Sequence, residues 1–137
     1  MERMIFVNLP VEDLALSKSF YEAVGATNDA QFTDESAAMM RFSQSICVML
    51  LTKKRFSSFT KREIPDAHRV AQVLLAISVD SRDGVDPLIA RAVGAGGAAD
   101  PNPPQDYGFM YSRSFADPDG HIWEPAWMDM SAIPQPA

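Results

Sequence analysis

Cysteine and histidine are scarce in this chain of 137 residues. It contains one Cys and two His, which excludes an intramolecular disulfide and a metal site built from several Cys or His side chains. It also lacks an apolar run long enough for a signal peptide or a membrane span. We therefore expect a cytoplasmic protein that does not enter a membrane.

Basic residues are fewer than acidic residues. Twelve Lys and Arg stand against 18 Asp and Glu, for a net charge of −6 and a pI near 4.7. Nucleic acids and anionic membranes favour basic surfaces, so neither is an expected partner. The hydrophobic share of 47% is sufficient for a buried core, and the length fits one domain.

A strand–helix pattern occurs twice along the chain. The segment of residues 5–11 is short and mostly apolar, which predicts a strand. Asp13 suits the N-cap of a following helix, and Gly25 suits its C-terminal end. Residues 73–79 predict an equivalent strand. Ser81 or Asp86 could cap the helix that follows, and Pro87 favours the later start because it suits the first helical position. The tetrapeptide Ala-Val-Gly-Ala closes both predicted helices, which indicates an internal repeat.

Each predicted helix is followed by at least two predicted strands. They span residues 37–43, 46–52, 108–115 and 121–127, and weaker signals lie at 29–33 and 97–104. We therefore predict an α+β protein built from two tandem β-α-β-β-β modules. The expected organisation is one domain of residues 1–130, with modules at about 4–52 and 73–130, a linker at 53–72 and a tail at 131–137.

The linker is locally basic. Five cationic side chains lie around Phe56 and Phe59: Lys53, Lys54, Arg55, Lys61 and Arg62. Two interpretations remain open. Residues 53–62 are either a solvated loop or a lid that brings positive charge to an anionic ligand.

Two segments carry a family resemblance. Residues 11–21, Val-Glu-Asp-Leu-Ala-Leu-Ser-Lys-Ser-Phe-Tyr, and residues 115–124, Phe-Ala-Asp-Pro-Asp-Gly-His-Ile-Trp-Glu, resemble the opening helix and the closing hairpin of the vicinal oxygen chelate superfamily. That superfamily includes glyoxalase I, fosfomycin-resistance proteins, extradiol dioxygenases and metal-free bleomycin-resistance proteins. The resemblance covers about residues 4–130 and implies an open, incompletely closed barrel whose concave cleft holds the ligand. It also implies a homodimer.

The resemblance places the four metal-ligand positions of the superfamily at Phe6, Leu50, Leu74 and Glu124. Only Glu124 is of a type that such a metal uses, whereas a divalent transition metal needs three or more N, O or S ligands. Asn8, on the same strand face as Phe6, could join Glu124 but would still leave a poor site. The resemblance therefore implies no metal cofactor here, with a divalent metal as the alternative.

Other side chains are candidates for contact with a ligand. Glu124 is either a general base in an apolar cavity or a structural residue paired with an arginine. Tyr107 and Tyr111 are candidates for the mouth of the pocket. Arg113 and Arg41 lie in predicted strands, where each could pair with Glu124, meet an anionic ligand or point outward.

Cys47 and the methionines have apolar interpretations. Cys47 stands three residues before Leu50, which predicts that it faces the helix-covered side as a small core residue. The eight Met residues suggest an adaptable apolar lining.

Three functions follow from the resemblance and these residues. The first is a metal-independent protein that binds a small molecule in its cleft, as bleomycin-resistance proteins do. The alternative is a lyase or isomerase of the glyoxalase type with Glu124 as general base. An inert or partner-binding scaffold is a third, and an extradiol dioxygenase is disfavoured because its iron would need two His where this chain has apolar residues. The sequence leaves open whether the protein is an enzyme.

Overall fold

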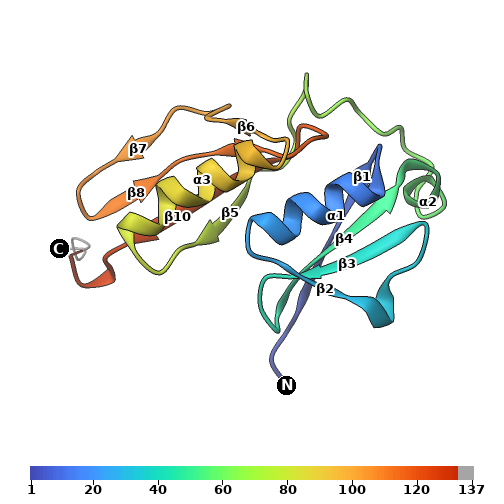
Figure 1. Ribbon diagram of the computed structural model, residues 1–137, viewed down its shortest axis with the longest axis horizontal. Helices are drawn as coiled ribbons and strands as arrows, with labels where there is room; N and C mark the ends of the chain where they lie inside the picture. The colour runs from blue at the N-terminus through green and yellow to red at the C-terminus, as the bar shows by residue number, and fades with distance from the viewer. Residues whose placement is uncertain (133–137) are drawn as a thin grey trace. The chain divides into compact units, whose positions relative to one another are not determined.

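The chain folds into two compact units, Met1–Val70 and Ala71–Ala137, in a computed structural model that describes residues 1–132 (Figure 1). The boundary between the units falls inside the expected linker. Each unit consists of one β-sheet and one long helix that lies across it. No helix within the described residues has the length and apolar character needed to cross a bilayer.

The first unit has the element order β-α-β-β-β. Its elements are β1 (Ile5–Val11), α1 (Leu14–Ala23), β2 (Thr27–Asp29), a 3₁₀ turn (Ala30–Phe32), β3 (Ala37–Arg41) and β4 (Ile46–Thr52). The sheet order is β1-β4-β3-β2. β1 runs parallel to β4, and the other pairs are antiparallel. A short helix, α2 (Lys53–Ser57), follows β4.

Local sequence sets the ends of α1 as predicted. The backbone N–H of Leu16 donates to the Asp13 carboxylate at 3.1 Å, so Asp13 is the N-cap. Past the other end, Gly25 has a φ of 108°, which side chains rarely tolerate. Phe20 and Tyr21 are both fully buried and anchor the helix on the sheet.

Burial alternates along β1 and identifies the two faces of the first sheet. Leu9 and Val11 are buried, whereas Phe6 is 46% exposed and Asn8 is exposed. Since alternate residues of a strand point to opposite faces, α1 covers the face that carries Leu9 and Val11. We call the opposite face, which carries Phe6 and Asn8, the open face of the first unit.

The second unit repeats this plan with interrupted strands. Its elements are β5 (Leu75–Ser78), a 3₁₀ turn (Arg82–Gly84), α3 (Val85–Gly94), β6 (Ala98–Ala99), β7 (Gln105–Asp106), β8 (Met110–Ser112), β9 (Phe115–Ala116), β10 (Ile122–Met128) and a 3₁₀ turn (Met130–Ala132). β5 is parallel to β10, while β8 and β9 pair antiparallel with β10. β6 and β7 lie outside β9 and β8. Counting β8 with β9 and β6 with β7 as broken strands gives the same order as in the first unit, so the predicted α+β repeat is confirmed.

A proline accounts for the break between β8 and β9. Pro125 lies in the middle of β10 and has no N–H to give to the neighbouring strand. Its carbonyl still accepts a hydrogen bond from the Arg113 N–H at 3.3 Å. The ladder therefore loses one bond at this point, and the regular strand stops at Ser112 and resumes at Phe115.

The predicted start of the second helix is wrong by two residues. α3 begins at Val85, directly after the 3₁₀ turn, and Pro87 lies within its first turn. The first backbone N–H groups of a helix have no acceptor inside the helix. A proline is therefore tolerated at Pro87 as well as at the first position, and it does not fix the start.

Candidate functional site

Strand register defines the side chains on the open face of the first unit. Residues paired across neighbouring strands project to the same face, and the pairs of β1, β4 and β3 continue across the sheet. The open face therefore carries Phe6, Asn8, Met39, Arg41, Cys47 and Met49. Most of this surface is apolar or sulfur-containing.

The expected place of Leu50 beside Phe6 is wrong. Leu50 pairs with Leu9 and is fully buried, so it belongs to the face that α1 covers. Met49 pairs with Asn8 and takes the position expected for Leu50. β4 is apolar on both faces, and its sequence therefore carried no alternation to show which residue points where.

The position of Met49 could have been predicted by counting residues from the turn that precedes the last strand of each unit. Glu124 follows the last residue of its turn, Gly120, by four positions, and Met49 follows Ser45 of the first unit by four. Cys47 is corrected for the same reason: it is buried, as expected, but it pairs with Phe6 and lies on the open face.

Glu124 lies on the open face of the second unit, which is the face turned away from α3. It pairs with Ala76, which is exposed, whereas its neighbour Trp123 on the opposite face is buried. Leu74 is 49% exposed and precedes Ala76 by two residues, so alternation places it on the face of Glu124. The Glu124 carboxylate is half-buried and makes no hydrogen bond or ion pair within residues 1–132.

Tyr111 and Arg113 lie on the opposite face from Glu124. Tyr111 pairs with Trp127, and its hydroxyl donates to Asp86 in the first turn of α3 at 2.7 Å. Arg113 donates to the same Asp86 oxygen at 3.0 Å. Tyr111 and Arg113, which the sequence analysis named as candidates for ligand contact, are thus turned toward α3, and Arg113 pairs with Asp86 and Asp100.

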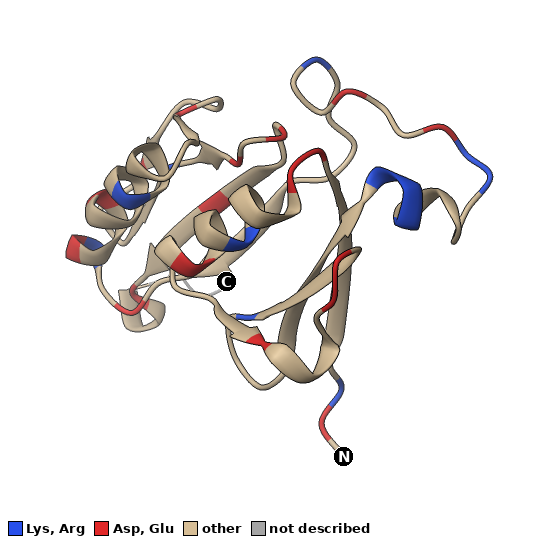
Figure 2. Cartoon of the chain, turned by 45° about the vertical axis from the view of Figure 1, so that its right-hand side comes forward, with Lys and Arg blue, Asp and Glu red and all other residues tan. Residues whose placement is uncertain are grey.

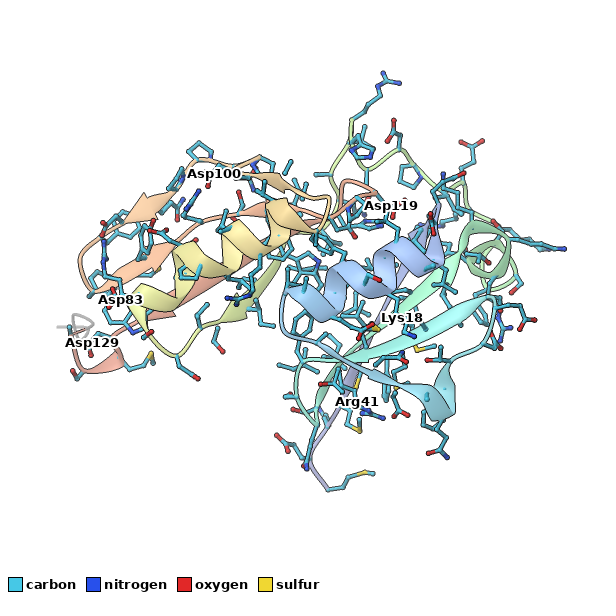
Figure 3. All side chains as sticks on the ribbon, in the orientation of Figure 1. Lys18, Arg41, Asp83, Asp100, Asp119 and Asp129 are labelled. Atoms are coloured by element: carbon cyan, nitrogen blue, oxygen red, sulfur yellow. The ribbon has the colours of Figure 1, made fainter. Side chains whose placement is uncertain are left out.

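Arg113 is the centre of an ionic network on the helix side. It holds Asp100 through two hydrogen bonds of 3.1 and 2.7 Å, and Asp100 is labelled in Figure 3. Arg82 binds Asp106 through both of its terminal nitrogens. Its guanidinium also lies over the Tyr111 ring, 4.5 Å from the ring centre. The network ties the interrupted strands to the start of α3.

These contacts shift the pKa values of the network. The Tyr111 hydroxyl and the Arg113 guanidinium lower the pKa of Asp86. Arg113 also lowers the pKa of Asp100, and Arg82 lowers that of Asp106. The hydrogen bond to Asp86 raises the pKa of Tyr111. All these groups are therefore held in their ordinary charged or protonated forms near neutral pH, which suits a structural role.

Tyr107 and the basic segment are exposed. Tyr107, between β7 and β8, is 61% exposed and stacks on Phe109 with ring centres 6.4 Å apart. The cationic residues of α2 are coloured blue in Figure 2. Lys53 forms an ion pair with Glu12 at 2.7 Å, and the Arg55 guanidinium lies over the Phe59 ring. These two contacts are within the first unit.

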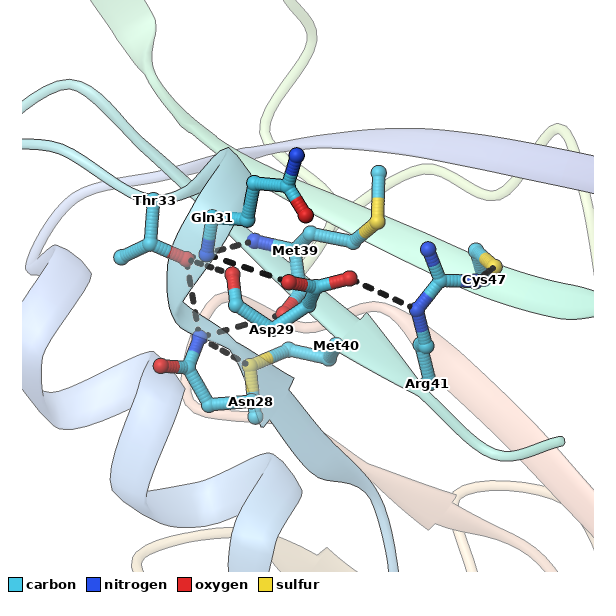
Figure 4. A network of polar contacts seen from close by, with 8 residues as sticks. All are labelled: Asn28, Asp29, Gln31, Thr33, Met39, Met40, Arg41 and Cys47. Atoms are coloured by element: carbon cyan, nitrogen blue, oxygen red, sulfur yellow. Dashed lines mark hydrogen bonds and ion pairs between the residues drawn. The ribbon is translucent and has the colours of Figure 1, made fainter. Parts of the chain in front are cut away.

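The Arg41 guanidinium is engaged by two side chains inside the first unit. Its Nε donates to Asp29 at 2.9 Å, and its Nη1 donates to the Cys47 sulfur at 3.1 Å (Figure 4). No pattern in the sequence points to Asp29 as this partner, because only the register of β2 on β3 brings Asp29 to the same face. A pocket of about 430 Å³ adjoins Arg41 and is lined by Thr27, Arg41, Phe42, Ser43 and Gln44.

The residues at the metal-ligand positions implied by the family resemblance do not fit a divalent metal. After the correction at Met49 those positions hold Phe6, Met49, Leu74 and Glu124, of which only Glu124 offers an oxygen donor. Such metals require several N, O or S ligands. Within the described part of the chain, no three His, Cys, Asp or Glu side chains are grouped closely enough to hold a metal ion.

Solved structures share this fold. A glyoxalase-related enzyme from Fulvimarina pelagi is 25% identical, with a TM-score of 0.76 over 93% of this chain and 88% of the other. The fosfomycin resistance protein FosX from Mesorhizobium loti is 17% identical, with a TM-score of 0.68 over 96% of each chain. An antibiotic-binding protein from a Streptomyces species is 20% identical, with a TM-score of 0.64 over 93% of this chain and 97% of the other.

Sequence comparison gives the family. No curated protein matches the chain. A family model does match, over residues 3–124, which is most of the chain, and the match ends within β10 at Glu124. On this match, the chain belongs to the Glyoxalase/Bleomycin resistance protein/Dioxygenase superfamily.

Proposed function

We propose that this protein binds a small molecule without a metal, and that Glu124 supplies the polar contact to the ligand. The observation that carries the proposal is the state of Glu124: a half-buried carboxylate with no partner in residues 1–132. Its strand neighbour on the same face is Ala76, and the exposed Leu74 lies two residues further along. A face of this kind suits a ligand with an apolar body and a hydrogen-bond donor or a positive charge.

The magnitudes support recognition by one carboxylate on an apolar surface. Apolar contact contributes roughly 25 cal/mol per Å² removed from water. A hydrogen bond to a charged group contributes about 1.5–3 kcal/mol. Apolar contact and the Glu124 hydrogen bond would therefore both contribute to affinity, and Glu124 would select for ligands that can donate to it. The antibiotic-binding protein and FosX among the similar structures support small-molecule binding on this fold.

A second candidate is a lyase or isomerase of the glyoxalase type. Glu124 without an internal partner is free to accept a proton, which favours a general base. Such a reaction also needs a group to stabilise the enediolate. Arg113 is bound to Asp86 and Asp100 on the face opposite Glu124, so it is not a ready electrophile. We therefore rank catalysis second.

One pair of measurements separates the two functions. Metal content is measured by mass spectrometry on untagged protein, and turnover is assayed with hemithioacetals of methylglyoxal and glutathione, with and without added nickel or zinc. We expect no stoichiometric metal and no turnover. Turnover that Glu124→Gln abolishes would replace binding by catalysis, and one tightly held metal per chain would overturn the metal-free proposal.

We also propose that the protein is a cytoplasmic homodimer. Closed two-fold dimers are the commonest assemblies of soluble proteins, and the superfamily commonly adopts them. Light scattering after size exclusion tests this. A mass of one chain, about 15.1 kDa, at micromolar concentration would contradict the dimer without affecting the small-molecule proposal.

A further inference from the structure

We infer that the first unit carries a second ligand subsite, which binds a carboxylate group in the pocket beside Arg41. The pocket is formed within this unit, by residues at the start of β2, at the end of β3 and in the turn before β4. It contains no part of the Glu124 face. The inference therefore goes beyond the proposed function and does not depend on it.

The size of the pocket suits a small molecule or one end of a larger one. Its volume is about 430 Å³, within the range of roughly 300–1,000 Å³ typical of ligand sites. Four of the five lining residues carry a polar or cationic side chain with hydrogen to donate: Thr27, Arg41, Ser43 and Gln44. None of the lining residues is acidic, so no carboxylate in the lining would repel an anion.

Arg41 is fixed in place before any ligand arrives. Asp29 holds its Nε and Cys47 holds its Nη1, as the dashed lines in Figure 4 show. Its Nη2 has no partner within residues 1–132. Because the guanidinium is already oriented, binding through Nη2 loses little side-chain entropy.

The Ser43 hydroxyl is also oriented by hydrogen bonds within the protein. Its hydroxyl oxygen accepts from the backbone N–H groups of Ser45 and Ile46, at 3.3 and 3.2 Å. Both of these bonds use the oxygen as acceptor, which leaves the hydroxyl proton to donate outward. The side chains of Thr27 and Gln44 also have no partner in the described part of the chain. A ligand oxygen would thus meet several unused donors.

Charge and shape narrow the ligand class. Asp29 neutralises much of the Arg41 charge at 2.9 Å, which favours a single carboxylate over a doubly charged phosphate. Phe42 adds an aromatic wall, and its ring is held edge-on to Tyr21 at 6.4 Å. An aryl carboxylate satisfies both features, with its ring against Phe42 and its oxygens toward Arg41.

The test is a titration followed by NMR of the backbone amides. Benzoate is compared with benzyl alcohol, which has a similar ring and no charge. We expect benzoate to shift the amides of residues 41–45 in a saturable manner and benzyl alcohol to do so far more weakly. Arg41→Gln is expected to weaken benzoate about tenfold, the loss of one charge-assisted hydrogen bond, while Arg62→Gln in the exposed linker is the matched control and leaves it unchanged.

Two further variants keep the proposal testable if the Arg41→Gln protein does not fold. Gln44→Ala leaves the Arg41–Asp29 pair intact and is expected to weaken benzoate measurably. Asp29→Asn removes the neutralising charge and is expected to tighten benzoate and to admit inorganic phosphate as a competitor. Equal shifts from benzoate and benzyl alcohol would overturn the subsite, as would an Arg41→Gln protein that melts normally and binds like the parent. Benzoate shifts confined to the amides around Glu124 would also overturn it, while leaving small-molecule binding itself in place.

Discussion

At the scale of single residues, the two neighbours Met49 and Leu50 have opposite roles. Leu50 is fully buried under α1, and Met49 is half-buried on the open face. The one-residue difference decides which side chain can reach a ligand. It also decides which one the stability of the first unit depends on.

Substitution of these neighbours tests the register directly. Leu50→Ala is expected to lower the free energy of unfolding by about 2–5 kcal/mol, because it leaves a cavity in the core. Met49→Ala is expected to cost less than about 2 kcal/mol, since part of its side chain is already in water. Urea denaturation measures both. Equal losses, or a larger loss at Met49, would contradict the assignment of faces.

At the scale of elements, the helix ends depend on local backbone chemistry. Gly25 follows α1 with a φ of 108°, whereas Gly94, the last residue of α3, has no such requirement. A Cβ added at either glycine would meet no heavy atom within 4 Å. The two positions therefore isolate the effect of backbone conformation.

Alanine at the two glycines is expected to act in opposite directions. Gly25→Ala forces a side chain into the left-handed region and should destabilise the protein by about 1–2 kcal/mol. Gly94→Ala should stabilise it by about 0.5–1 kcal/mol, because it restricts the unfolded chain at a compatible position. Thermal melts compare the two proteins with the parent. A stabilising Gly25→Ala would show that the turn after α1 is not as described.

The ionic network is a second feature of this scale, since it joins the interrupted strands to α3. The pKa values of Asp86, Asp100 and Asp106 are lowered from 3.8 in the folded state. Each carboxylate therefore stabilises the fold above its unfolded pKa, and this stabilisation disappears as the pH falls through the folded pKa. The loss belongs below about pH 4, and neutral pH retains the full contribution.

Arg113→Gln tests this pH dependence. The variant should be less stable than the parent at pH 7, because Asp86 and Asp100 lose a shared partner. The difference should shrink as the pH is lowered from 5 toward 3, where the carboxylates of the parent are protonated. Urea denaturation across this range measures it. A difference that stays constant down to pH 3 would show that Arg113 acts through packing alone.

At the scale of the whole molecule, the repeat was readable from sequence, whereas the membership of the two faces was not. β1 alternates, so Phe6 and Asn8 could be placed on one face in advance. β4 is apolar throughout, so alternation could not distinguish Leu50 from Met49, and the sequence alone did not show how the strand of Tyr111 and Arg113 pairs with β10. Only the register of paired strands and the position of Asp86 on α3 resolve these positions.

The central claim for the whole molecule is metal-independent binding by a face that carries one unpaired carboxylate. A thermal-shift screen of small molecules against protein dialysed with EDTA tests it most directly, with Glu124→Gln screened in parallel. We predict that compounds with an apolar body and a donor or cationic group raise the melting temperature without metal, and that Glu124→Gln weakens these shifts. Hits that appear only after nickel or zinc is restored would contradict the account.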